Sequence, residues 1–148
     1  MRHVCLLFVF VIAQLVWAGV APSATLTVRG RNVILRPVSA TAGQDPDPLV
    51  NQVTAALKYR KGRADPPQKI TVETNVGSPL FTLKIEAVNV RSGIPAGELT
   101  LVTTAQDLIT NISRNGSKAC DLRYTLVALA SDGTGTDVHT VTYTMIAN

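Results

Sequence analysis

The chain has 148 residues, of which 46% are hydrophobic, 5% aromatic and 16% charged, and its formal net charge is +4. This length suffices for one ordinary domain with a single core. The mild positive charge does not indicate a nucleic-acid partner, and so few aromatic residues provide no evident stacking platform for bases or sugars.

The first 24 residues have the layout of a secretory signal peptide. A short basic start precedes an apolar run over residues 4–21, and small residues with a proline follow it. A transmembrane anchor is the alternative, but it needs roughly 20 apolar residues and usually charged flanks, and no charge follows this run before Arg29. We therefore expect cleavage of residues 1–24 and secretion of residues 25–148 to the periplasm, cell surface or extracellular space. Only an uncleaved leader would contact a membrane.

Loss of the leader would leave 13 basic residues against 10 acidic ones, a net charge of +3. Cys120 would then be the lone cysteine, so no internal disulfide could form and burial would have to provide the stability. We expect Cys120 to be a buried, small apolar residue, with an intermolecular disulfide as the alternative. The basic cluster at residues 58–63 is expected to be a solvated strand end and turn; contact with a polyanion such as surface polysaccharide is the alternative.

Beyond the leader, apolar and polar residues alternate, and turn residues separate the runs, which is typical of short β-strands. The runs lie at residues 25–28, 32–38, 52–60, 69–74, 81–90, 98–104, 107–113, 120–130 and 137–146. The run at 107–113 is ambiguous between a strand and a short helical turn. The pattern predicts seven or eight strands in an all-β fold, an antiparallel immunoglobulin-like β-sandwich in one domain. Half-polar strands favour sheets with one wet face.

The last two runs are separated by residues 131–137, which are dense in glycine and aspartate and predict a hairpin loop. The apolar faces of both strands have to lie on the same side, because a one-residue slip would turn one face to water. The resulting register pairs Leu126 with Tyr143, Tyr124 with Met145, Ala128 with Val141, and Ala130 with His139. It predicts that the chain ends in a core strand.

The sequence offers little chemistry. The expected mature chain has one histidine, His139, and one cysteine, Cys120, which the predicted hairpin separates by some 30 Å. A Cys–His nucleophile pair or a shared metal site is therefore not expected. The chain has no G-x-S-x-G element, and its cysteines and histidines are too few for a zinc site. We expect no enzymatic activity, no cofactor and no metal.

Acidic loops and two glycosylation triplets are weaker signals. Asp132 and Asp137 flank the last loop, and two more aspartates lie in residues 45–48. These loops lack the alternating acids and terminal glutamate of a calcium-binding EF-hand, so the aspartates are expected to form turns. Asn111 and Asn115 begin formal N-glycosylation triplets, which matter only in a eukaryotic host.

The ending "DVHTVTYTMIAN" (residues 137–148) resembles the last strand of fimbrial subunits and of spore-coat-U-like secreted proteins, which typically end in Thr-rich alternating strands. In such families one chain lends a strand to the open groove of its neighbour. The resemblance implies two candidate assembly strands. Residues 25–30, with alternating Leu26 and Val28, would be the lending strand. The final strand is the second candidate, with Val141, Tyr143 and Met145.

These observations predict a secreted structural or adhesive subunit that associates through strand edges with itself or with protein partners, and not with nucleic acid. The alternative is a monomeric secreted module that binds a sugar or a protein with its loops. Those loops would be residues 44–49, 60–67 and 131–137.

Overall fold

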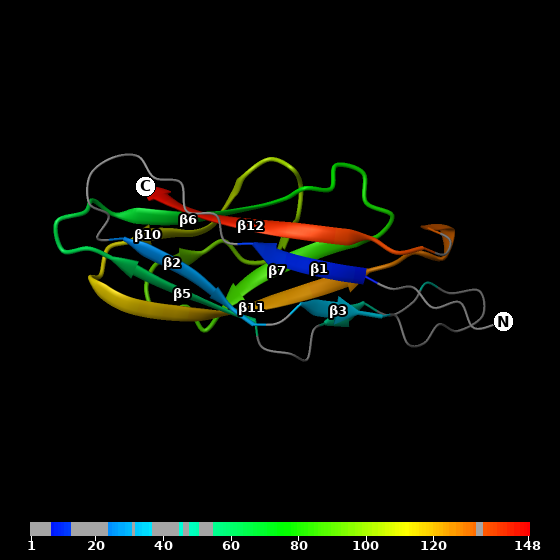
Figure 1. Cartoon of the computed structure of the whole chain (residues 1–148), viewed down its shortest axis with the longest axis horizontal. Helices are drawn as coiled ribbons and strands as arrows, with labels where there is room; N and C mark the ends of the chain where they lie inside the picture. Colours follow the sequence, from blue (N-terminus) through cyan, green and yellow to red (C-terminus); the bar gives the residue numbers. More distant parts are fainter. Residues whose placement is uncertain are drawn as a thin grey trace.

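The computed structural model describes residues 7–12 (backbone), 24–30, 32–36, 45, 48–50, 55–132 and 135–148. Within these ranges the chain forms twelve strands and one short 3-10 helix, η1 (Ala130–Asp132). The strands belong to two sheets that pack face to face (Figure 1). The prediction of an all-β sandwich is confirmed.

The order of the strands in each sheet differs from their order in the sequence. Sheet A contains β3 (Val33–Leu35), β1 (Leu7–Ile12), β12 (Val138–Ala147), β6 (Gln68–Thr74), β10 (Gln106–Ile112) and β8 (Ile94–Pro95). Sheet B contains β2 (Thr25–Arg29), β5 (Ala55–Lys61), β11 (Gly116–Val127), β7 (Thr82–Val88) and β9 (Leu99–Thr100). A further short strand, β4 (Leu49–Val50), pairs with β11. The described pairs are antiparallel except for the parallel pair of β1 and β12.

Alternate residues from both sheets form the core, as the period-two pattern predicts. On β7, Leu83, Ile85 and Ala87 are buried, and on β6 Ile70 and Val72 are buried. Paired strands bring such residues into common rows, because directly opposed residues of a ladder share one face. Along β7 and β11 these rows join Leu83 to Leu126, Ile85 to Tyr124, and Ala87 to Leu122.

Several strand boundaries differ from the predicted ones. The ambiguous run at 107–113 is a strand, β10, whereas the run at 98–104 contains only the two-residue strand β9. Residues 92–97, which lie between two predicted runs, contain β8, and β8 pairs with β10. Gly93, with φ of 102°, makes this approach possible, since a Cβ there would lie 2.5 Å from Ile109 Cγ2. Residues 37–38 and 52–54 of the predicted runs lie outside the described residues.

The predicted hairpin between the last two strands is wrong. β11 pairs with β5, β4 and β7 in sheet B, whereas β12 pairs with β6 and β1 in sheet A. The chain therefore crosses from one sheet to the other between the two strands, and His139 is not paired with Ala130. The two apolar faces still meet, but across the core, where the hydroxyls of Tyr124 and Tyr143 are hydrogen-bonded.

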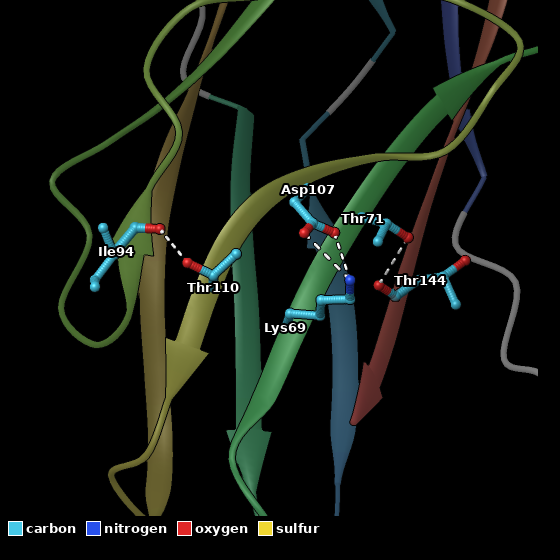
Figure 2. Close-up of polar contacts among 6 residues, drawn as sticks. All are labelled: Lys69, Thr71, Ile94, Asp107, Thr110 and Thr144. Atoms are coloured by element: carbon cyan, nitrogen blue, oxygen red, sulfur yellow. Dashed lines mark hydrogen bonds and ion pairs between the residues drawn. The ribbon is translucent and has the colours of Figure 1, made fainter. Parts of the chain in front are cut away.

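Polar contacts join neighbouring strands on the outer face of sheet A (Figure 2). Lys69 Nζ on β6 lies 2.9 Å from Asp107 Oδ1 on β10. Thr71 Oγ1 donates a hydrogen bond of 3.5 Å to the carbonyl oxygen of Thr144 on β12. Because such exposed ion pairs contribute only about 0.2–1 kcal/mol, the core contributes far more to stability than these contacts do.

The hydroxyl pair predicts an energetic coupling between the sheets. Tyr143→Phe should lower the free energy of unfolding by about 1–2 kcal/mol, because it removes one partner of a buried hydrogen bond. In the Tyr143→Phe background, Tyr124→Phe should lower the free energy of unfolding by less than it does in the unchanged chain, since the shared hydrogen bond is already lost. Urea denaturation of the two single variants and the double variant measures this coupling.

Tyr59→Phe is the matched control, because the Tyr59 hydroxyl donates instead to the carbonyl oxygen of Ser92 at 2.7 Å. Its effect should add to that of Tyr143→Phe. Additive effects of Tyr124→Phe and Tyr143→Phe would contradict the contact between the sheets.

Candidate functional site

The strand β1 fills an internal position of sheet A. Its five residues from Phe8 to Ile12 pair in parallel with Val138–Thr142 of β12. Its other edge pairs antiparallel with β3, from Leu7 opposite Leu35 to Val9 opposite Val33. In Figure 1 the blue strand β1 lies beside the orange-red β12. A segment of the expected signal peptide thus joins two strands of the expected mature domain.

The strands on either side of β1 offer a buried, mostly apolar lining. On β3, Val33 and Leu35 are each 2% exposed, and on β12 His139 and Val141 are fully buried. The strand pairs align residues of β3, β1 and β12 into three rows on the inner face of sheet A. Position 7 joins Leu35, position 9 joins Val33 and His139, and position 11 joins Val141. Only one of these lining residues, His139, can donate or accept a side-chain hydrogen bond.

His139 has a hydrogen-bond partner on one side of β12. Its Nδ1 and Thr74 Oγ1 of β6 are hydrogen-bonded at 2.9 Å. Its Nε2 is buried and has no hydrogen-bond partner in the described part of the chain. Burial lowers the pKa of His139 below its ordinary value of 6.5, because it disfavours the imidazolium, and the nearby Asp137 carboxylate partly opposes this. The folded protein therefore favours the neutral ring.

Tyr143 and Cys120 are also buried. Burial raises the pKa of Tyr143, and also that of Tyr124, with which it shares a hydrogen bond. Burial raises the pKa of the Cys120 thiol to about 12, and the residue is only 2% exposed. Since the thiolate is the reactive form, Cys120 acts here as a small apolar residue, as predicted.

Both candidate assembly strands are paired in the structure. Leu26 and Val28 lie in β2, at the edge of sheet B, where β2 pairs with β5. Leu26 is buried and Val28 half-buried. Val141 and Tyr143 on β12 are buried, Met145 is half-buried, and all three pair with β6. Among the described strands, β2 therefore has a partner on one edge only, and β12 lies between two strands.

The basic cluster at residues 58–63 divides into two kinds of side chain. Lys58, Arg60 and Arg63 are exposed, as expected for a solvated strand end. Lys61 is instead buried, and its Nζ donates hydrogen bonds to the carbonyl oxygen of Gly62 and to Asn115 Oδ1. Lys61, the last residue of β5, falls within the predicted binding loop at residues 60–67, and its ammonium group is engaged by hydrogen bonds within the chain.

The loop aspartates cap backbone amides. Asp137 Oδ2 accepts a hydrogen bond of 2.8 Å from the Phe81 amide, which ties the last loop to the start of β7. Asp132 Oδ2 and Asp45 Oδ1 likewise accept from backbone amides, each at 2.7 Å. Asp47 and residues 133–134 lie outside the described residues. Over the ranges given above, no three of the His, Cys, Asp and Glu side chains are grouped as they would be to hold a metal ion.

The asparagines of the two triplets are both exposed, near the connection between β10 and β11. Asn111 has a positive φ of 53°, at an irregular part of the ladder with β6.

No helix in the described ranges is long and apolar enough to span a membrane. No protein-family model matches the chain, and no curated protein shows significant similarity to it.

Sequence reasoning missed the residues that line the strand position. The sequence pairs His139 with Ala130 and tests it as a catalytic residue or metal ligand, and it places Val33 and Leu35 in an early strand. The available signal was the alternation within residues 137–146, which put His139 on the same face as Val141. Nothing in the leader's apolar run distinguished a strand from an export segment.

The lowered pKa of His139 predicts that acid destabilises the protein. The unfolded imidazole takes up a proton near pH 6.5, before the folded one does. The free energy of unfolding should therefore be undiminished above this pH and should fall as the pH drops toward the folded pKa. Urea denaturation of the full chain at several pH values between about 8 and 5 measures the slope.

His139→Gln should flatten this slope, whatever it does to the overall stability. His3→Gln, which changes the other histidine of the chain, should leave the slope intact. An unchanged slope in His139→Gln would show that the proton is taken up elsewhere.

Proposed function

We propose that this protein is a secreted structural or adhesive subunit that assembles by receiving a strand between β3 and β12. The observation that supports the proposal is the position of β1. It is an internal strand of sheet A, and its residues belong to the expected signal peptide, which would be cleaved. Residues 1–24 act as the signal peptide in this proposal, and residues 25–148 are the exported domain at the cell surface or in the periplasm.

Removal of the leader would leave two facing unpaired edges. β3 and β12 would lie about 10 Å apart, two strand spacings, with one strand missing between them. Backbone groups on both edges would lose their partners, and the apolar rows of Val33, Leu35 and Val141 would be uncovered. Such a place favours the addition of a strand, since main-chain hydrogen bonds give affinity and alternate side chains fill the rows.

The lending strand in this proposal is β2, at the start of the exported chain. It lies at the edge of sheet B, and within the described part of the chain its one strand partner is β5. Its exposed residues Thr25, Thr27 and Arg29 make little contact with the core, so its release would expose mainly Leu26 and part of Val28. A strand so placed can leave one sheet and join another at a small loss of buried apolar surface.

The described side chains favour binding over catalysis. The single thiol of the expected mature chain is buried, with a pKa raised to about 12. The loop aspartates are engaged by backbone amides. Strand addition needs none of these groups to react, because its affinity comes from ladder hydrogen bonds and apolar burial.

The protein consisting of residues 25–148 should form polymers, whereas the full chain with its leader retained should remain monomeric. The reason is that the leader occupies the receiving position in one form and leaves it open in the other. Static light scattering on the two purified forms measures the difference. Deletion of residues 25–30 from the mature form should abolish the polymers by removing the lending strand.

A soluble peptide that contains residues 7–12 between lysine flanks is the matched control. It should limit polymer growth in the mature form, whereas a peptide with the same residues in scrambled order should not. A mature protein that stays monodisperse and binds a sugar or a protein through residues 60–67 or 131–137 would overturn the proposal in favour of a binding module.

A further inference from the structure

The row of position 9 contains the one polar side chain that lines the strand position. His139 is fully buried, and the ladder pairs it with Val9 of β1, which also pairs with Val33 of β3. Its Nε2 is buried without a hydrogen-bond partner in the described ranges. Native proteins satisfy nearly all buried polar groups, and each exception calls for an explanation.

The orientation of the ring explains which side Nε2 faces. The two nitrogens of an imidazole point in nearly opposite directions. Nδ1 is hydrogen-bonded to Thr74, on β6, which lies on one side of β12. Nε2 is therefore the nitrogen turned away from Thr74 and β6, and the other described strand beside β12 is β1. The residue that pairs with His139 in the filling strand is the one best placed to reach this atom.

We propose that His139 selects the strand that fills the position between β3 and β12 by hydrogen-bonding to a serine or threonine in that strand. The partner is a protein segment with apolar residues in the rows of Leu35 and Val141 and a hydroxyl in the row between them. A hydroxyl fits because it can donate to Nε2 or accept from it, whichever nitrogen of the neutral ring carries the proton. This inference rests on the proposed addition of a strand between β3 and β12 and specifies the chemistry of its partner. It does not rest on β2 as the lending strand, because Leu26 and Val28 share one face of β2 with no hydroxyl between apolar residues.

The leader is a suboptimal occupant in this respect. Its residue at the row of His139 is Val9, which has no polar side-chain atom. A strand that satisfies Nε2 gains an additional buried hydrogen bond over one that does not, and leaving a buried polar group unpaired weakens binding by roughly tenfold or more. The geometry thus favours a hydroxyl-bearing strand over the leader in the same place.

Two variants of the full chain test this inference. Val9→Thr places a hydroxyl in the row of His139, and Val11→Thr places one in the row of Val141, with nearly the same change of shape. Val9→Thr should slow hydrogen exchange of residues 7–12 by about tenfold, and Val11→Thr should speed it by about tenfold because its hydroxyl is buried without a partner. Hydrogen-exchange mass spectrometry on the full chain with its leader retained gives both rates.

Two further outcomes separate this inference from the proposed function. If residues 7–12 are protected in the unchanged chain and both variants lose protection equally, selection by His139 is overturned while the strand position stands. If residues 7–12 show no protection in the unchanged chain, the strand position and the selection are both overturned. In the His139→Leu background, Val9→Thr should lose its advantage, and a retained advantage would also overturn the role of His139.

Discussion

An internal strand position in a sheet has to be filled, and this requirement governs the whole of sheet A. Buried backbone amides and carbonyls without partners cost as much as lost hydrogen bonds, so an open row between two strands is a strong template for a third. β3 and β12 present such a row, and β1 fills it with hydrogen bonds on both sides. The position of β1 between β3 and β12 determines the strand order at this end of sheet A. It also contributes to the burial of Val33 and to the environment of His139.

The strand that would receive a partner is also a core strand. β12 contacts β6 along one edge, and its inner face meets sheet B, where Tyr143 is hydrogen-bonded to Tyr124. Its two functions are thus separated by direction. Side chains stabilise the domain across the core, while the backbone edge toward β1 pairs with β1 and would pair with the incoming strand in the proposed assembly. In the proposed assembly, a strand would be exchanged at that edge while the contact between the sheets is kept.

The sequence predicted the strands and their buried faces, but not the strand neighbours. Alternation identifies which residues turn inward, and Leu83, Ile85, Val141 and Tyr143 are buried as expected. The same alternation is satisfied whether two apolar faces belong to a hairpin or lie opposite each other across a sandwich. The apolar faces of β11 and β12 lie opposite each other across the sandwich, because both edges of β11 pair with strands of sheet B. The loop composition at residues 131–137 carries no information about that choice.

The candidate site was beyond sequence reasoning for a related reason. A strand position is defined by the two strands on either side of it, and the residue pattern of a strand does not show which strands become its neighbours. The expected assembly residues Val141 and Tyr143 lie on β12, one of the two strands beside this position. His139 is informative only because Thr74 satisfies one of its two nitrogens. Its second nitrogen is a property of the fold and not of the local sequence.

The composition of the leader differs from what its place in the sheet requires. Position 8 pairs with Val138 and Ile34, which are both 46% exposed and apolar, so an apolar residue suits the outer face there. Positions 10 and 12 pair with Thr140 and Thr142, where a half-polar strand would carry polar residues, yet the leader has Phe10 and Ile12. This uniform hydrophobicity is what an export segment needs and exceeds what the sheet needs. Secretion, as proposed, would explain the sequence of residues 1–24, and a place in the sheet that accepts a strand for its inner rows would explain the position of β1.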